Sequence, residues 1–287
     1  MTDAGITYHR PRDLAEALEF LHERGGETEI LAGGTDVMVG LRSGSLKKRY
    51  LLDVSRLPEL KVIEIDEDAF CVGAGVTIAA IGASELVRTH APALAKCTQT
   101  FASRQIRNMA TIGGNVAHCS PCGDTIPPLM IHDAAAVLVG KEGAREVPVA
   151  AIADGPYSCA LPAGELILKF KLKRPTGPTF ADFRKIGRRK ALAIARISLA
   201  AMARQAKDGR IEDIKLSLGS CTPTPWRVAA VEEMLLHRRP TLSLLWEAGR
   251  VLAEKTIEIT GRRSSAVYKE PAAQGLLVRT LLPLVKE

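Results

Sequence analysis

The stretch Ala32-Gly33-Gly34-Thr35-Asp36 is the most informative part of this chain, and Thr111-Ile112-Gly113-Gly114-Asn115 repeats its pattern about eighty residues later. Glycine has no Cβ and tolerates positive φ, so its backbone amides can approach a ligand closely. Successive amides in such a turn form a concave site for an anion. A single Gly-Gly pair more often marks an ordinary turn. Two such strings, each after an apolar run, predict a dinucleotide held at its phosphates from two sides.

Apolar periodicity predicts a helix over 14–24, ended by Gly25-Gly26, and then a strand over 29–32 that leads into the first glycine string. Ligands commonly bind at the carboxyl end of such a strand.

Gly73-Ala74-Gly75 is not a Rossmann fingerprint, because Ile78 stands where the third glycine would be. The sequence also predicts strands over 50–54, 60–65, 70–73, 135–139 and 165–172, helices over 79–87, 92–100 and 129–131, and a loop over 120–128. The strands over 60–65 and 70–73 form a predicted hairpin.

The run Arg174-Pro175-Thr176-Gly177-Pro178 is the predicted domain boundary, because proline and glycine interrupt regular structure. We expect one domain over 1–176, with subdomains over about 1–56 and 57–176, and a second domain over 177–287. In the second domain, the pattern predicts antiparallel strands over 180–186, 194–207 and 211–218 and helices over 228–236, 242–255 and 271–284.

Composition is that of an ordinary globular protein: 46% of the 287 residues are hydrophobic and 25% are charged. The net charge of +7 raises the possibility of nucleic-acid binding, but the basic residues are spread along the chain and only 12 aromatic residues (six Phe, four Tyr, two Trp) are present. No apolar run reaches the roughly 20 residues that cross a bilayer. The first residues lack the pattern of a signal peptide. We therefore expect a cytoplasmic protein that binds no nucleic acid and has no membrane span.

Six cysteines are widely scattered, and only Cys119-Ser120-Pro121-Cys122 has the spacing of a metal or redox site. A four-cysteine cluster would need a second such pair, which the sequence lacks. No metal-binding residue is predicted.

The order of these strings is distinctive when two further ones are added: Ser120-Pro-x-x-Asp124-x-x-Pro127-Pro128 and Phe183-x-Lys185 before an arginine-rich turn. Together they resemble the FAD-binding medium subunit of the xanthine dehydrogenase and carbon monoxide dehydrogenase family of molybdenum hydroxylases, over essentially the whole chain. The resemblance implies an α+β fold. A two-subdomain FAD-binding domain of the PCMH type, similar to vanillyl-alcohol oxidase, would precede a C-terminal domain with a three-stranded antiparallel sheet and a three-helix bundle.

The resemblance also implies roles for single residues. Residues 30–37 and 111–115 would hold the FAD pyrophosphate, Asp124 would bind FAD hydroxyls, and Lys185 would lie near the isoalloxazine ring, where a cation stabilises negative charge. Phe101 would lie near the flavin or adenine, with core packing as the alternative, and Ile167 would contribute strand contacts. The predicted cofactor-binding residues are Ile30, Leu31, Ala32, Gly33, Gly34, Thr35, Asp36, Val37, Phe101, Thr111, Ile112, Gly113, Gly114, Asn115, Asp124, Ile167 and Lys185. No catalytic residue is predicted.

In the family that the chain resembles, a large subunit carries the molybdenum cofactor and a small subunit carries two [2Fe-2S] clusters. FAD receives the electrons and passes them to NAD, oxygen, a quinone or another acceptor. The resemblance therefore implies an electron-transfer subunit in a dimer of heterotrimers. Family members usually have small residues where Cys119 and Cys122 stand. An incomplete cluster site and a redox-labile pair are open interpretations, and we favour small buried thiols near the flavin.

Two other functions remain open on the sequence alone. A standalone flavin oxidase or reductase would use the same glycine strings, because a fold does not determine a function. A basic binding module without cofactor would use the excess of arginine and lysine.

Overall fold

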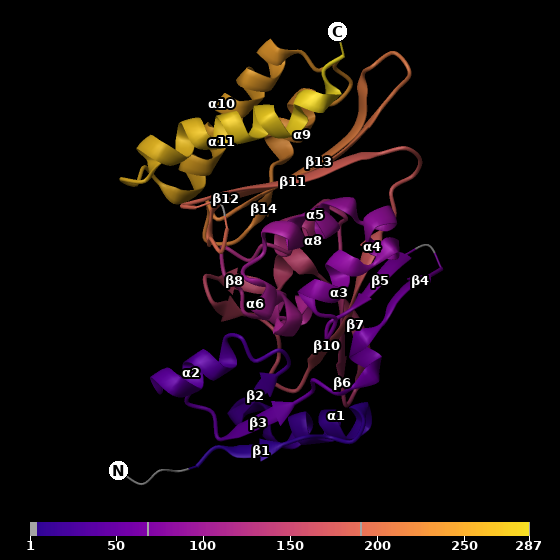
Figure 1. The fold of residues 1–287 in the computed structure, drawn as a ribbon, viewed down its shortest axis with the longest axis vertical. Helices are drawn as coiled ribbons and strands as arrows, with labels where there is room; N and C mark the ends of the chain where they lie inside the picture. Colours follow the sequence, from indigo (N-terminus) through magenta and orange to yellow (C-terminus); the bar gives the residue numbers. More distant parts are fainter. Residues whose placement is uncertain (1–4, 68, 190, 287) are drawn as a thin grey trace.

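The computed structural model describes residues 5–67, 69–189 and 191–286. The described residues form four sheets, of which the three larger ones follow one another along the long axis of the molecule, from the N-terminal end to the C-terminal end (Figure 1). Helices separate the second sheet from the third and cover the outer face of the third. Within the described residues, no helix combines the length and the hydropathy that a membrane span requires.

The first sheet is parallel and has the strand order β1-β3-β2. The predicted helix over 14–24 is confirmed: Asp13 caps it by accepting a hydrogen bond from the Glu16 amide, and Ala17, Phe20 and Leu21 are buried at helical spacing. A short 3-10 turn follows in place of a left-handed glycine cap. The elements are β1 (Thr7–His9), α1 (Leu14–Arg24), η1 (Gly25–Glu27), β2 (Thr28–Leu31), α2 (Val37–Ser43) and β3 (Tyr50–Asp53).

The second sheet is antiparallel and has the order β4-β5-β10-β6-β7. The predicted hairpin of β4 and β5 is confirmed. The strand β10, which is distant in sequence, lies between β5 and β6. Phe170 of β10 lies opposite Val72 and Ala136 and is fully buried. The elements are η2 (Pro58–Lys61), β4 (Ile63–Asp66), β5 (Ala69–Gly73), β6 (Ala135–Gly140), β7 (Gly143–Pro148) and β10 (Leu166–Lys173).

Short helices join these strands and differ from the prediction in two places. The single helix expected over 79–87 is wrong: the chain is extended at Ser84, whose hydroxyl accepts from the Val87 amide and starts a second helix. The loop expected over 120–128 gives way to a helix at its end, where Pro127 and Pro128 sit in the first turn and need no amide donor. The elements are α3 (Ile78–Ala83), α4 (Glu85–His90), α5 (Pro92–Thr100), α6 (Arg104–Met109), α7 (Ile112–Ala117), α8 (Ile126–Ile131), η3 (Val149–Ala151), β8 (Ala153–Gly155) and β9 (Ser158–Cys159).

The third sheet has three long antiparallel strands, as predicted, and a two-residue strand, β14, on the edge of β13. The last helix begins at Ala266, five residues before the predicted start, and contains Pro271. Burial of Ala273, Leu276 and Leu277 beyond the proline holds this helix against the core despite the lost hydrogen bond. The elements are β11 (Phe180–Gly187), β12 (Ala195–Gln205), β13 (Ile211–Gly219), β14 (Trp226–Arg227), α9 (Ala229–Leu235), α10 (Leu242–Thr260), α11 (Ala266–Leu281) and η4 (Leu282–Leu284).

The third sheet is buried on both faces. Ala200 and Met202 of β12 belong to the apolar core of the first domain, whereas the alternate residues Leu199 and Ala201 pack in the core with α10 and α11. Figure 1 shows this sheet between α10 and α11 on one side and α5 and α8 on the other. On β11, Lys185 shares its face with Ala181 and Phe183, which belong to the core of the first domain. The C-terminal domain therefore directs Lys185 into the first domain.

Candidate functional site

The first glycine string connects β2 to α2 and leaves its amides unused. Gly34 has φ 71°, which only glycine adopts without strain. Within the described chain, the backbone amides of 33–37 find no backbone or side-chain acceptor. Five consecutive free donors at the carboxyl end of a strand suit a ligand with negatively charged oxygens.

The second glycine string forms no such nest of free donors, contrary to expectation. Thr111 caps α7, and its hydroxyl and carbonyl accept from the amides of Gly114 and Asn115 at 3.1 and 3.0 Å. The amides of Ile112 and Gly113 donate to the carbonyls of residues 76 and 74 at 3.0 and 2.8 Å. A Cβ on Gly113 would lie 2.6 Å from the Ala74 Cβ, so this glycine is required for packing. Gly114 is exposed, and the string therefore offers a ligand an open backbone face instead of a row of free amides.

The two strings lie side by side, which supports the predicted two-sided clamp. A Cβ on Gly33 would lie 1.9 Å from the carbonyl oxygen of Met109, two residues before the second string. Just after the second string, His118 Nδ1 lies 3.8 Å from Oδ1 of Asp36, the last residue of the first string. His118 was not a predicted site residue, and its position directly after the short helix α7 carries no sequence signal for this contact.

Asp124 and Lys185 form a buried ion pair between the two domains. Lys185 Nζ lies 2.5 Å from Asp124 Oδ2, and the side chains are only 5% and 7% exposed. The same ammonium donates to the Thr100 carbonyl at 3.1 Å, next to Phe101. The other carboxylate oxygen, Asp124 Oδ1, is buried without a hydrogen-bond partner among the described residues. A buried oxygen in this state is ready to accept a hydroxyl donor from a ligand.

Asn115 connects the second string to this pair. Its Oδ1 accepts from the Thr125 amide at 3.2 Å and from the Thr125 hydroxyl at 2.7 Å, so the loop that carries Asp124 is fastened to α7. Thr125 is fully buried and was not predicted as a site residue. A hydroxyl residue next to a candidate carboxylate is the only hint of it in the sequence.

The remaining predicted residues contribute apolar surface and backbone. Phe101 caps α5 and belongs to the buried core, which agrees with the packing alternative for this residue. Ile167 lies on β10 opposite Leu138, next to a bulge, and is buried in the same core. Ile30 lies on β2 and packs against the N-terminal core. Leu31 ends β2, and the other predicted positions, Ala32, Thr35 and Val37, lead from there to the first residue of α2.

Burial raises the pKa of the Asp124 carboxyl to about 6, and the Lys185 ammonium opposes this shift. A carboxyl that binds its proton more tightly in the folded chain stabilises the fold at low pH, and this contribution is lost as the pH rises through the folded pKa. We expect the free energy of unfolding of the native apoprotein, relative to Asp124→Asn, to fall by about 3 kcal/mol between about pH 3 and pH 7. Urea unfolding of both proteins over this range measures the difference. A difference that does not change with pH would contradict the raised pKa.

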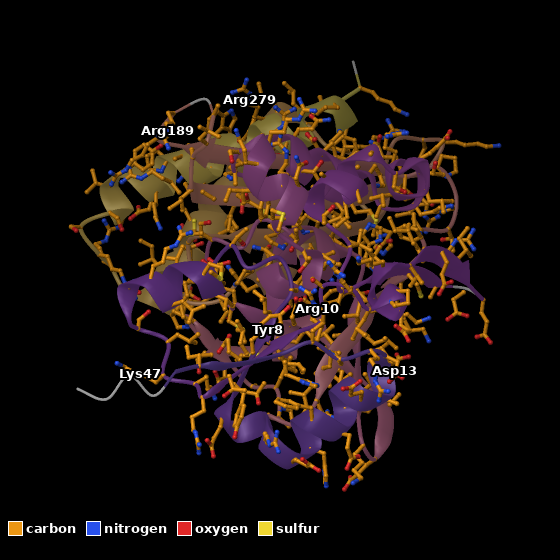
Figure 2. All side chains as sticks on the ribbon, turned by 60° about the horizontal axis from the view of Figure 1, so that its bottom comes forward. Tyr8, Arg10, Asp13, Lys47, Arg189 and Arg279 are labelled. Atoms are coloured by element: carbon orange, nitrogen blue, oxygen red, sulfur yellow. The ribbon has the colours of Figure 1, made fainter. Side chains whose placement is uncertain are left out.

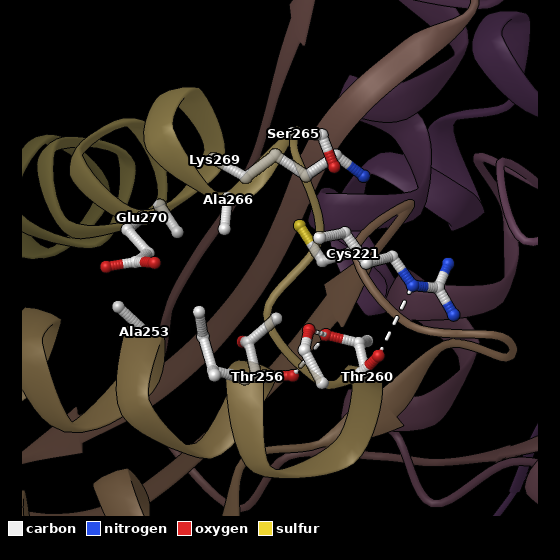
Figure 3. A pocket seen from close by; sticks show the side chains of 12 residues that line it. Cys221, Ala253, Thr256, Thr260, Ser265, Ala266, Lys269 and Glu270 are labelled. Atoms are coloured by element: carbon white, nitrogen blue, oxygen red, sulfur yellow. Dashed lines mark hydrogen bonds between the residues drawn. The ribbon is translucent and has the colours of Figure 1, made fainter.

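Two other features lie apart from this site. A cavity of about 50 Å³ between α10 and α11, lined by Cys221, Thr256 and Glu270 among others, contains none of the predicted residues and is too small for a dinucleotide (Figure 3). The basic side chains are dispersed: Lys47 lies by the first sheet, whereas Arg189 and Arg279 lie over the C-terminal domain (Figure 2).

The cysteine spacing does not bring Cys119 and Cys122 together as a pair. Cys119 is buried and shares a pKa shift with Cys159, whereas Cys122 is partly exposed and contributes to the raised pKa of Cys221. No group of three or more potential metal-ligating side chains is found in the described parts of the chain.

The fold and the adjoining strings define a flavoprotein domain joined to a C-terminal sheet-and-helix domain. Residues 4–174 match the family described as "FAD binding domain in molybdopterin dehydrogenase", and 182–284 match "CO dehydrogenase flavoprotein C-terminal domain". The chain thus belongs to the family of FAD-binding medium subunits of molybdopterin dehydrogenases, as the sequence predicted.

Its relatives are subunits of several dehydrogenases. The nicotinate dehydrogenase FAD-subunit of Eubacterium barkeri is 28% identical and aligns over 98% of this chain and 96% of its own length. The carbon monoxide dehydrogenase medium chain of Hydrogenophaga pseudoflava is 28% identical over 96% and 95% of the two chains. The solved structure of carbon monoxide dehydrogenase from that organism superposes with a TM-score of 0.90 at 26% identity and covers 96% of each chain. The expected α+β fold with a separate C-terminal domain is confirmed.

Proposed function

We propose that this chain carries FAD and transfers electrons within a molybdenum hydroxylase complex. The observation that carries the proposal is the close contact of the first glycine string with residues 109 and 110, which lead into the second string, in a chain that matches FAD subunits over nearly its whole length. When bound, FAD accepts and releases electrons singly or in pairs.

The residues present fit such a cofactor. The free amides of residues 33–37 would bind pyrophosphate oxygens, and the open backbone at Gly114 would allow the phosphates to approach from the other side. Asp124 Oδ1 would accept from a hydroxyl of the cofactor, while Lys185 holds Asp124 in place and keeps a positive charge at the end of the site. We retain all seventeen predicted positions, from Ile30 to Lys185, as the proposed cofactor-binding set.

The proposed partners are a large subunit with the molybdenum cofactor and a small subunit with [2Fe-2S] clusters, in a dimer of heterotrimers. The support is that the relatives are named as subunits or medium chains of dehydrogenases and that the chain aligns with nearly their full length. A cytoplasmic location and the domain ranges 1–176 and 177–287 stay predictions; β10 ends at Lys173 and β11 begins at Phe180, on either side of the proposed boundary.

Purified chain is expected to contain about one FAD per protein and to show a flavin absorbance spectrum, because the free amides and the buried carboxylate oxygen are already in place. Absorbance and extracted-flavin analysis measure this stoichiometry. Chain that stays colourless after incubation with FAD would contradict the proposal.

Affinity purification of tagged chain from its native cell, followed by mass spectrometry, tests the partners. We expect a molybdopterin protein and a [2Fe-2S] protein in equal amounts. Flavin-loaded chain that purifies alone and oxidises a small molecule by itself would favour the standalone enzyme.

A further inference from the structure

The hairpin of β8 and β9 is fastened to the turn that follows the second glycine string. The Tyr157 amide donates to the Cys119 carbonyl at 2.9 Å. The Ile152 carbonyl accepts both from the Ala160 amide at 2.8 Å and from Cys119 Sγ at 3.8 Å. Cys119 is therefore held against the hairpin that carries Cys159, and the two thiols lie close enough to shift each other's pKa.

The two thiols have different surroundings. Cys119 is 2% exposed, whereas Cys159 lies on the surface of the hairpin. The neighbouring Cys119 thiol lowers the pKa of Cys159, with a further contribution from the Leu161 amide, whereas burial and Asp154 oppose this shift. The pKa of Cys119 is raised by the same contact and by burial. The pair thus combines an accessible sulfur that ionises readily with a second sulfur that holds its proton.

We propose that Cys119 and Cys159 form an oxidisable dithiol, a redox modification site that closes to a disulfide on exposure to hydrogen peroxide. Neither the cysteine spacing of the sequence nor the proposed electron-transfer function assigns this pair.

The chemistry balances in two steps. The Cys159 thiolate attacks peroxide, so that an S–O bond forms, the O–O bond breaks and the departing hydroxide takes a proton to become water. Cys119 then attacks the sulfenic sulfur of Cys159, an S–S bond forms, and a second water leaves with the Cys119 proton. In total, two thiols lose two electrons and two protons, and one peroxide becomes two waters.

The position of the pair gives the disulfide a structural effect. Cys119 directly follows His118, which contacts both Asp36 of the first string and the Tyr157 ring of the hairpin. Tyr157 and Cys119 both have positive φ, at 58° and 51°, so this turn and hairpin are already held in one geometry. A covalent bond between them would fix the hairpin against the end of the glycine clamp.

The test treats the full-length, FAD-loaded chain with hydrogen peroxide, then denatures and alkylates it for mass spectrometry. The sequence has six cysteines. We expect alkylatable thiols to fall from six to four, one cross-linked peptide pair to contain Cys119 and Cys159, and a dithiol reductant to restore all six. A cross-link between Cys119 and Cys122, a sulfinic acid on Cys159 without a cross-link, or six unchanged thiols would overturn the proposal.

Two serine variants sharpen the result. Cys159→Ser changes an exposed position and is expected to fold and to keep its five thiols under the same treatment. Cys122→Ser is the matched control at the other end of the Cys-x-x-Cys string, and it should fall from five thiols to three with the same cross-link. Loss of two thiols in Cys159→Ser would show that another pair reacts and would refute the assignment.

Discussion

The Gly114→Val variant is expected to purify folded but without FAD. A Cβ at this position meets only the Thr111 hydroxyl oxygen, at 3.1 Å, so the helix α7 tolerates the new side chain with a small adjustment. The same side chain covers the exposed backbone beside the first string, where the phosphates would approach. Loss of about 3 kcal/mol of binding free energy lowers the affinity by roughly 100-fold. Flavin absorbance of the purified variant and titration of its apoprotein with FAD measure the effect.

Gly275→Val is the matched control, because Gly275 lies within helix α11 and a Cβ there meets nothing within 4 Å. This control should retain FAD like the native chain. Gly34→Val should lose FAD as well, but with some loss of stability, because its φ of 71° is strained for a β-branched residue. Stoichiometric FAD in purified Gly114→Val would show that the phosphates do not bind against the exposed backbone at Gly114.

Replacing Lys185 by methionine is expected to lower the stability of the apoprotein by about 3 kcal/mol at pH 8, or roughly 10 °C in melting temperature. The substitution leaves the Asp124 carboxylate buried and without its counter-ion, which is the costly way to break a buried ion pair. The loss should shrink as the pH falls, because Asp124 then takes up a proton and becomes neutral. Urea unfolding at several pH values measures both effects.

Lys96→Met is the comparison across the same domain interface. Lys96 pairs with Asp182 at 3.0 Å, but its side chain is 46% exposed and Asp182 keeps a second partner, Arg184. Its removal should cost about 1 kcal/mol or less. Adding Asp124→Asn to Lys185→Met should recover part of the lost stability, since no buried charge remains. Equal losses for Lys96→Met and Lys185→Met would argue against a special cost of burial at Lys185.

The sequence predicted the elements whose residues make local patterns. The helix over 14–24 and the helix over 92–100 have the predicted bounds, because an N-cap or an initial proline starts each one and apolar residues recur at helical spacing. The long strands of the third sheet were predicted for the same reason. The strand β1 was missed, because three partly exposed residues carry no alternation that a sequence reading can detect.

Long-range contacts decided what the sequence could not predict. The second glycine string forms a helix cap in which the amides from Ile112 to Asn115 are all bonded, and the carbonyls of residues 74 and 76 accept from Ile112 and Gly113. The single helix expected over 79–87 broke at Ser84, which acts as a cap for the next helix. Asp124 and Lys185 were singled out only through the resemblance, since 61 residues separate them and neither shows a local pattern.

The sheet of β11, β12 and β13 is covered on both faces, and this affects how the chain unfolds. Cutting the chain between β10 and β11 would uncover the face with Ala200 and Met202 and, opposite it, the apolar side of α5 and α8. Neither half could keep such a surface in water without collapse or association. We therefore expect the two sequence domains to unfold as a single cooperative unit, so that the clamp is lost together with the whole molecule.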